Sequence, residues 1–404
     1  MGRVAAIFCM AGRGHLQRLL PLVTGLARHG MEPVVFSNAI FRDPVERAGG
    51  RLIDLFARYP LDAADALSRP VPSRYVSFAA RYVAPLLEDV ARLGPALVVY
   101  DTFAVIGRVL GRHLGVPYVN VCAGHNMSPA RAIAVEQARV TPSDACRRAV
   151  EVLRERWGIL DASPMSYFTG LSPFLNVYCE PAAFLRPEER AAFEPVAFFG
   201  SVRIPDPAGE APALGEPPSR AWREAPVRVY VSFGTVVWRY FETEALRALA
   251  VIARALGARD DARAVISLGG HPVAPAARAQ LERANVEVVD YVDQWRVLQD
   301  ASVYLTHQGL NSTHEAIYHL VPMISHPFFV DQPGLAMRCQ ELGLAIPLAG
   351  AVQGVLAEGD VHAAFARLAE RWGHLQANLA RARSWEIEVM QGREAVIQRI
   401  LDLR

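Results

Sequence analysis

The stretch Thr306–Gly334, THQGLNSTHEAIYHLVPMISHPFFVDQPG, places a histidine, small polar residues and acidic residues at regular spacing. His307 follows the apolar residues 301–305, which predict a buried strand, and a helical pattern begins a few residues later. In an open parallel sheet, ligands bind beyond the carboxyl ends of the strands. The loop residues that would meet such a ligand are Gly309, Asn311, Ser312 and Thr313. Because the free N–H groups of a helix N-terminus favour an anion, the pattern predicts a phosphate site that uses neither lysine nor metal.

The same residues have a plainer interpretation. Ser312-x-x-Glu315 fits a capping box, in which each side chain bonds to a backbone N–H at the helix start. Spacing alone leaves both interpretations open. His314 and His319 lie on the same predicted helix, but no cysteine or carboxylate completes a zinc set.

A second candidate is the segment GRGHLQRLLPL near the N-terminus, where His15 stands close to the start of a predicted helix. Asp101 directly follows the predicted strand 96–100, so both residues belong to carboxyl ends of one sheet and can meet. A carboxylate beside a histidine fixes its tautomer and stabilises the imidazolium, which predicts a general base. The alternative is that each residue only caps a helix. Gly12-x-Gly14 lacks the third glycine of a dinucleotide-binding fingerprint, so NAD is weakly supported.

A third candidate is VYVSFGT, which ends a predicted strand with Ser232, Gly234 and Thr235. These residues fit a second anion-binding turn or a simple turn. No D-x-D pair of carboxylates occurs in the chain, so a metal-bridged diphosphate has no obvious ligands and we expect no metal site.

Short apolar strands and amphipathic helices alternate in both halves of the chain, which predicts an α/β fold with parallel, doubly wound sheets. The expected strands are 4–9, 33–36, 96–100, 117–122, 227–232, 263–267, 286–289, 302–305 and 322–325. The expected helices are 16–28, 74–92, 103–114, 242–256, 312–319, 335–342 and 388–403. Residues 126–172 break this rhythm and are expected to add helices and loops around a variable pocket.

Residues 205–226 are rich in Pro, Gly and Ala and predict a linker. We therefore expect an acceptor-binding domain at 1–204, a donor-binding domain at 227–387 and a C-terminal helix at 388–404 that packs back on the first domain. The cleft between two such domains is the default ligand site.

The composition excludes several classes of protein. The 404 residues contain no lysine, which removes P-loop NTPases, protein kinases and pyridoxal enzymes. A net charge of +1 does not indicate a nucleic-acid-binding protein. No apolar run reaches the length of a membrane span. Five scattered cysteines without a C-x-x-C pair fit a reduced, cytoplasmic setting.

Together these motifs resemble the family 1 nucleotide-sugar-dependent glycosyltransferases, above all the bacterial macrolide and natural-product enzymes. The resemblance covers nearly the whole chain and is strongest from Val288 to Pro347, where the order His, Gly-x-Asn-Ser/Thr, Glu, Pro, Asp-Gln matches the family signature. It implies the GT-B fold, with two facing Rossmann-like domains and an interdomain cleft.

The resemblance also implies roles for individual residues. The diphosphate of the donor would be held by His307 and its loop, the ribose by Glu315, and the sugar hydroxyls by Asp331 and Gln332. Gln294 would read the base, and His15 with Asp101 would act on the acceptor. Two departures from the family concern the donor: Tyr291 stands where many members stack a tryptophan on the base, with Trp295 out of register, and Leu310 replaces the tryptophan of plant relatives.

We therefore expect a metal-independent, inverting hexosyltransferase of bacterial type that uses a UDP- or TDP-sugar and no cofactor. The acceptor is expected to be a small, largely apolar molecule bound by Tyr75, Phe78, His125, Met127 and Phe168. No membrane span or nucleic-acid partner is expected, and the chain would be a monomer or homodimer. The alternatives are a lipid-sugar transferase of the same fold, a non-catalytic nucleotide-sugar-binding accessory protein, and an epimerase.

Overall fold

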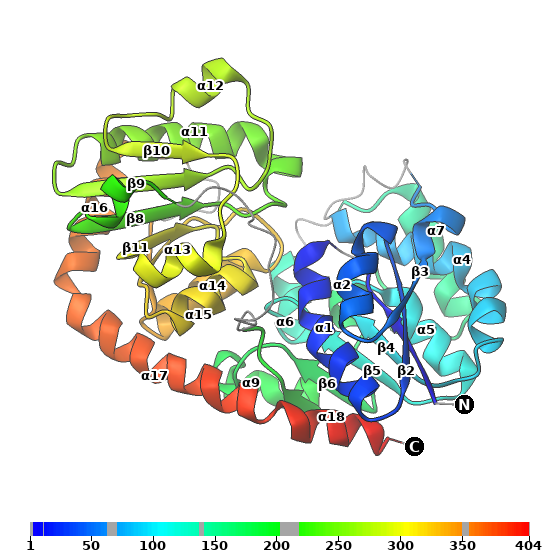
Figure 1. Ribbon diagram of the computed structural model, residues 1–404. Helices are drawn as coiled ribbons and strands as arrows, with labels where there is room; N and C mark the ends of the chain where they lie inside the picture. The colour runs from blue at the N-terminus through cyan, green and yellow to red at the C-terminus, as the bar shows by residue number, and fades with distance from the viewer. Residues whose placement is uncertain are drawn as a thin grey trace. The chain divides into compact units, whose positions relative to one another are not determined.

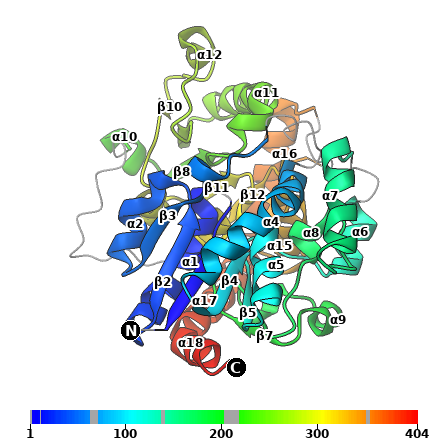
Figure 2. The same ribbon diagram turned by 90° about the vertical axis from the view of Figure 1, so that its right-hand side faces the viewer.

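The computed structural model describes residues 3–10, 12–62, 71–136, 141–202, 218–349 and 355–403. The chain divides into two compact units, each built around one parallel β-sheet (Figure 1 and Figure 2). Unit 1 comprises Met1–Gly200 and Val389–Arg404, and unit 2 comprises Ser201–Glu388.

The sheet of unit 1 has the strand order β3-β2-β1-β4-β5-β6-β7. Its strands are β1 (Val4–Phe8), β2 (Glu32–Ser37), β3 (Arg51–Asp54), β4 (Pro95–Asp101), β5 (Tyr118–Cys122), β6 (Leu175–Tyr178) and β7 (Val196–Phe198). Its helices are α1 (Arg13–Arg28), α2 (Arg42–Arg47), α3 (Leu55–Arg58), α4 (Arg74–Ala91), α5 (Val105–Leu114), α6 (Pro129–Glu136), α7 (Asp144–Glu155), α8 (Ser166–Thr169), α9 (Pro187–Arg190) and α18 (Arg393–Leu401). Short 3₁₀ turns cover Ala39–Phe41, Val71–Ser73, Ala182–Phe184 and Ala191–Phe193.

Helices α1 and α18 pack closely although they lie at opposite ends of the chain, as Figure 1 shows in blue and red. A Cβ atom on Gly25 would lie 2.1 Å from Cδ1 of Ile397, so the glycine makes room for the Ile397 side chain against α1. The central strands β4 and β5 are buried along almost their whole length, as expected for a parallel sheet covered by helices on both faces.

The sheet of unit 2 has the order β10-β9-β8-β11-β12-β13. Its strands are β8 (Val227–Ser232), β9 (Ala262–Ser267), β10 (Val286–Val289), β11 (Val303–Thr306), β12 (Met323–Ser325) and β13 (Ala345–Pro347). Its helices are α10 (Arg220–Arg223), α11 (Trp238–Gly257), α12 (Pro275–Ala279), α13 (Gln294–Asp300), α14 (Leu310–Tyr318), α15 (Gln332–Glu341), α16 (Glu358–Glu370) and most of α17 (Trp372–Gln391).

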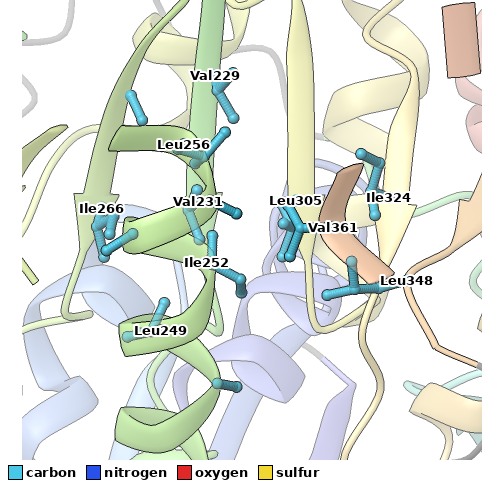
Figure 3. Packing of buried hydrophobic residues seen from close by; sticks show 14 of the residues in the cluster. Val229, Val231, Leu249, Ile252, Leu256, Ile266, Leu305, Ile324, Leu348 and Val361 are labelled. Atoms are coloured by element: carbon cyan, nitrogen blue, oxygen red, sulfur yellow. The ribbon is translucent and has the colours of Figure 1, made fainter. Parts of the chain in front are cut away.

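Aliphatic side chains of the sheet and of the helices packed on it form the core of unit 2, as Figure 3 shows. Leu249, Ile252 and Leu256 of α11 meet Val229 and Val231 of β8, and all five side chains are almost completely buried. Such packing fixes helix positions against the sheet, and therefore fixes the loops at the strand ends.

Most of the predicted elements are confirmed to within a few residues at each end, and the two parallel sheets confirm the predicted α/β class. The strands β3, β6, β7 and β13 and the helix α16 were not predicted. The single helix expected at 388–403 is wrong, because α17 starts at Trp372 and a break at Gly392 separates it from α18.

Residues 205–217 of the predicted linker lie outside the described residues. Its remaining part is packed structure, because Trp222 of α10 is buried and donates from Nε1 to the carbonyl of Val229 at 3.2 Å. None of the described helices combines the length and apolar character that a bilayer crossing needs.

Both sheets reverse their strand order at one point, which lies between β1 and β4 in unit 1 and between β8 and β11 in unit 2. The crevice at such a switch point is the usual binding position in doubly wound sheets. His15 and Asp101 follow β1 and end β4, while Gly234 and His307 follow β8 and β11. Each unit therefore places its predicted site residues at its own switch point.

Candidate active-site regions of the two units

In unit 1 the structure brings His15 and Asp101 together. His15 Nδ1 lies 3.3 Å from Asp101 Oδ1, and the side chains are 16% and 0% exposed. The Asp101 carboxylate also accepts hydrogen bonds from the backbone N–H groups of Met10 at 2.8 Å and Phe103 at 2.7 Å. Two backbone donors and the His15 ring therefore contact a carboxylate that water does not reach.

The alternative in which His15 and Asp101 only cap helices does not describe this geometry. The N-cap of α1 is Gly12, and the N-cap of α5 is Ala104. Asp101 does order the turn before α5 through its bond to Phe103 N, but it contacts His15 as well. With Nδ1 facing the carboxylate, the imidazole has its Nε2 available as a proton acceptor.

One aromatic ring, that of Phe103, packs on the histidine and joins it to a cluster of further rings. The Phe103 ring lies 4.5 Å from the His15 ring, and it also contacts Tyr75 at 6.0 Å and Tyr167 at 5.6 Å between ring centroids. Phe168 packs against Tyr167 at 5.0 Å. Tyr75, Phe103, Tyr167 and Phe168 are called the aromatic wall below. Phe103 was not among the predicted site residues, although its position two residues after Asp101 is a usable signal.

Three of the predicted acceptor-binding residues are placed elsewhere or remain without a role. Phe78 contacts Phe56 and Tyr82 and lines a crevice of about 230 Å³ between α4 and α7, which contains no residue of the aromatic wall. His125 is buried against Glu180, with Nδ1 2.8 Å from Oε2. Met127 is buried. The buried pairing of His125 with Glu180 indicates a structural histidine, and its contact with an acceptor stays a prediction.

In unit 2 two turns close around His307. A Cβ atom on Gly234 would lie 2.7 Å from His307 Nε2, and one on Gly309 would lie 2.4 Å from the same atom. Gly234 has φ +69, which only glycine adopts readily. Ser232 Oγ accepts a hydrogen bond from Gly234 N at 3.2 Å, whereas Thr235 is exposed in the turn that follows. Glycine is thus required on both sides of the imidazole.

Burial lowers the pKa of His307 to about 4, although a backbone hydrogen bond with Ser232 acts in the opposite direction. The imidazole is therefore neutral at neutral pH. Its Nδ1 is buried and has no hydrogen-bond partner among the described residues. A neutral histidine has one N–H, which it can donate either to the Ser232 backbone or to a phosphate oxygen, and it does not supply a fixed positive charge.

The helix α14 begins at Leu310 with Gly309 as its N-cap, so the capping-box interpretation of Ser312 and Glu315 is wrong. Ser312 Oγ instead donates to Gln294 Oε1 at 3.2 Å, and Gln294 Nε2 donates to Glu315 Oε2 at 2.6 Å. Tyr304 OH donates to the same Gln294 oxygen at 2.8 Å. Gln294, Tyr304, Ser312 and Glu315 thus form one polar cluster between α13, β11 and α14.

Thr313 bonds to the start of its own helix. It is fully buried, and both its backbone N–H and its hydroxyl donate to the carbonyl oxygen of Gly309, at 2.9 and 3.0 Å. Asn311 stands in the first turn of α14, where backbone N–H groups have no partner within the helix. The donor contact expected of Thr313 stays a prediction; in this structure its hydroxyl bonds to the carbonyl of Gly309, four residues earlier.

Asp331 and Gln332 begin α15, as its N-cap and first residue. The Gln332 side-chain oxygen accepts the N–H groups of Phe328 at 2.9 Å and Phe329 at 3.3 Å. Backbone N–H groups therefore occupy the side-chain oxygen of Gln332. Its –NH₂ is the group that could contact a ligand.

Two further aromatic residues of unit 2 are candidates for contact with a nucleotide base. Tyr291 is half-buried beside the glycine turn that follows β9, with Cδ2 3.7 Å from a Cβ built on Gly270. Trp295 packs on Tyr318 and His319 at the far end of α14, at 5.2 and 4.3 Å. In the described ranges, no group of three or more His, Cys, Asp or Glu side chains is arranged to hold a metal ion.

Comparison with known proteins finds glycosyltransferases with similar sequences and folds. Residues 223–369 match the family model described as UDP-glucoronosyl and UDP-glucosyl transferase. The oleandomycin glycosyltransferase of Streptomyces antibioticus is 26% identical over 360 residues, covering 85% of this chain and 79% of that protein.

Solved structures share the fold over the whole chain. The glycotransferase of kitacinnamycin has a TM-score of 0.76 at 21% identity and covers 99% of this chain and 100% of its own. The spinosyn rhamnosyltransferase SpnG, solved with thymidine diphosphate, has a TM-score of 0.65 at 19% identity and covers 98% and 99%. The family match at residues 223–369 and the GT-B fold shared over the whole chain make this chain similar to nucleotide-sugar glycosyltransferases, including the bacterial natural-product enzymes.

Proposed function

We propose that the protein is a metal-independent, inverting glycosyltransferase that moves a sugar from a UDP- or TDP-linked donor to a hydroxyl of a small, largely apolar acceptor. His15 would be the general base. The contact between His15 Nδ1 and the buried Asp101 carboxylate, at 3.3 Å, is the observation that carries the proposal. It is a histidine whose tautomer is fixed and whose other nitrogen can take a proton.

The chemistry of the acceptor side follows from this pair. An aliphatic hydroxyl is a weak nucleophile at neutral pH, and a positioned base that removes its proton during attack contributes roughly 10²–10⁴-fold. Asp101 keeps Nδ1 protonated and stabilises the imidazolium that forms. Phe103, which packs on His15 and is the partly exposed member of the aromatic wall, supports a flat or apolar acceptor. The similarity to an oleandomycin glycosyltransferase supports a natural product of this kind.

The donor side would use unit 2. The first N–H groups of α14 and the neutral His307 would take the diphosphate, whose charge increases as it leaves. Glu315 would meet the ribose, and Asp331 with the –NH₂ of Gln332 would meet sugar hydroxyls. Gln294 and Tyr291 would meet the base, which requires Gln294 to exchange one of its present partners. The thymidine diphosphate bound to SpnG supports a TDP donor, and the UDP-sugar family model supports a UDP donor.

A single displacement by the deprotonating hydroxyl inverts the anomeric carbon, so an α-linked donor would give a β-glycoside. The direct test incubates the purified chain with UDP- and TDP-hexoses and a panel of phenolic and aliphatic acceptors. Product is identified by mass, and its anomeric configuration by NMR coupling constants. An α-glycoside from an α-linked donor would contradict the single displacement, and the absence of transfer with every donor would contradict the activity.

Metal independence has its own test. We expect equal rates in buffer and in excess chelator, because no D-x-D carboxylates occur in the sequence and a helix N-terminus can hold the diphosphate. Activity that is lost in chelator and restored by magnesium or manganese would contradict this part of the proposal.

A further inference from the structure

Three non-glycine residues in the described ranges have left-handed backbones: Gln308 (φ 62), Leu320 (φ 61) and Val330 (φ 56). Such a conformation is unfavourable for residues with a Cβ atom and persists only where the surroundings hold it. Gln308 directly precedes the N-cap of α14 and Leu320 directly follows its C-cap, so the two ends of one helix can be compared.

The conformation of Leu320 is explained by how the helix ends. Val321 N donates to the carbonyl of Ala316 at 2.9 Å, and Leu320 N donates to that of Ile317 at 3.0 Å. This pair of bonds is the Schellman motif, which requires a left-handed residue just after the C-cap. No comparable motif requires Gln308 to be left-handed, because the turn there joins a strand to a helix.

Side-chain contacts hold Gln308 instead. The residue is fully buried, and its Nε2 donates to Thr313 Oγ1 at 3.0 Å and lies 3.2 Å from Met323 Sδ and 3.5 Å from Cys339 Sγ. Its backbone N–H donates to Thr306 Oγ1 at 3.1 Å. These partners belong to β11, α14, β12 and α15, so four elements fix one residue.

The contacts continue to the candidate phosphate loop. Thr313 Oγ1, which receives the Gln308 amide, donates to the Gly309 carbonyl at 3.0 Å, and Gly309 packs directly on the His307 ring. A rotation of Gln308 about its backbone would therefore move both of its neighbours. One of these neighbours is the N-cap of α14, and the other is the histidine proposed to contact the diphosphate.

We infer that Gln308 is a positioning residue for the nucleoside diphosphate: its left-handed backbone, held through the Gln308–Thr313–Gly309 contacts, sets His307 and the start of α14 in their binding geometry. The inference rests on the proposed function. Gln308 itself need not touch the nucleotide, since its side chain points into the protein and is not exposed.

The test uses calorimetric affinity for UDP and TDP beside thermal melting. Gln308→Met keeps the size and removes the amide, and Thr313→Val keeps the shape and removes the hydroxyl. We expect each to weaken nucleotide affinity by about five- to tenfold, the effect of one lost hydrogen bond. The double variant should be no weaker than either single variant, because both interrupt the same series of contacts. Thr313→Ser, which keeps the hydroxyl, should bind within about threefold of wild type.

Leu320→Gly is the matched control, because it changes the left-handed residue at the other end of the same helix. We expect its nucleotide affinity to stay within about twofold of wild type. If Gln308→Met and Thr313→Val melt earlier but bind nucleotide like wild type, Gln308 is only structural and the inference is overturned. If Gln308→Met does not fold, the Thr313→Val and Thr313→Ser pair decides in the same way. Wild-type protein that binds neither nucleotide would overturn the proposed function and this inference with it.

Discussion

A histidine–carboxylate pair from each unit can be compared, because the two pairs have the same chemistry in different surroundings. In unit 1 the His15 side chain is 16% exposed beside a buried Asp101. In unit 2 His314 of α14 lies 2.5 Å from Glu386 of α17, and both side chains are 0% exposed. Only the first histidine can exchange a proton with a bound molecule, so only the first pair can act as a base.

The two carboxylates also differ in their partners. Asp101 accepts two backbone N–H groups in addition to its contact with His15. Glu386 Oε2 is buried and has no hydrogen-bond partner among the described residues. The first carboxylate is held from three sides and orients its histidine, whereas the second joins two helices. A histidine–carboxylate contact therefore indicates a base only where the histidine reaches the surface.

The largest expected effect is on the exposed pair. His15→Ala should lower transfer to an aliphatic hydroxyl by roughly 10²–10⁴-fold, while calorimetric affinity for the nucleoside diphosphate stays nearly unchanged. A phenolic acceptor, with a pKa near 10, should lose less because it is already acidic. Asp101→Asn should resemble a milder His15 variant, since it disturbs the orientation of the base without removing it. If His15→Ala lost nucleotide binding but kept transfer, the turn that contains His15 would be a phosphate-binding turn and His15 would not be the base.

Breaking the buried pair should affect stability. Glu386→Leu or His314→Leu alone should lower the free energy of unfolding by about 3–5 kcal/mol, because each leaves one buried polar partner uncompensated. The double variant His314→Leu/Glu386→Leu should recover most of that loss, since both groups are removed together. Urea unfolding of the wild type, the two single variants and the double variant gives the coupling free energy between His314 and Glu386. Additive losses in the double variant would mean that the two side chains do not interact.

Buried histidines without a carboxylate should give a pH dependence. Burial lowers the pKa of His326 from 6.5 to about 4, so the folded state keeps this imidazole neutral while the unfolded state protonates it. Its contribution to stability is present above pH 6.5, decreases as the pH falls and is gone below about 4. The full change in the free energy of unfolding between these two pH values is roughly 3 kcal/mol. Unfolding free energies at a series of pH values should fall less steeply for His326→Gln than for wild type, and identical slopes would contradict the assignment.

The smallest expected effect is at His307. His307→Ala should weaken nucleoside diphosphate binding by about ten- to a hundredfold and lower turnover with it, because a hydrogen bond to a charged phosphate oxygen is lost. The pKa of about 4 keeps the imidazole neutral at pH 7, so no ion pair adds to this loss. Calorimetry at pH 7 checks the value. Unchanged affinity would exclude His307 from the phosphate site.

The outline of both sheets could be predicted because buried parallel strands have apolar runs such as Val227–Ser232, which form a strand with the same bounds. The strand β3, RLID, and the strand β6, LNVY, were missed because polar residues interrupt the apolar pattern. Asn176 of β6 is buried, its amide donates to the carbonyl of Phe193, and its side-chain oxygen accepts from Asn120 Nδ2, 56 residues earlier. Hydrogen bonds of that kind depend on segments far along the chain, which local patterns do not report.

The sequence by itself determined which residue types stand at the carboxyl ends of the strands, since strand periodicity and the loop glycines depend on local chemistry. Only the tertiary structure decided what those residues contact. It paired His125 with Glu180, buried Thr313 against its own helix start and placed Gln294 between Ser312 and Glu315. It also left His15 partly exposed beside Asp101. The reason is physical: burial and hydrogen-bond partners are set by packing between elements that are distant in sequence, and those two quantities decide whether a polar side chain stabilises the fold or reacts.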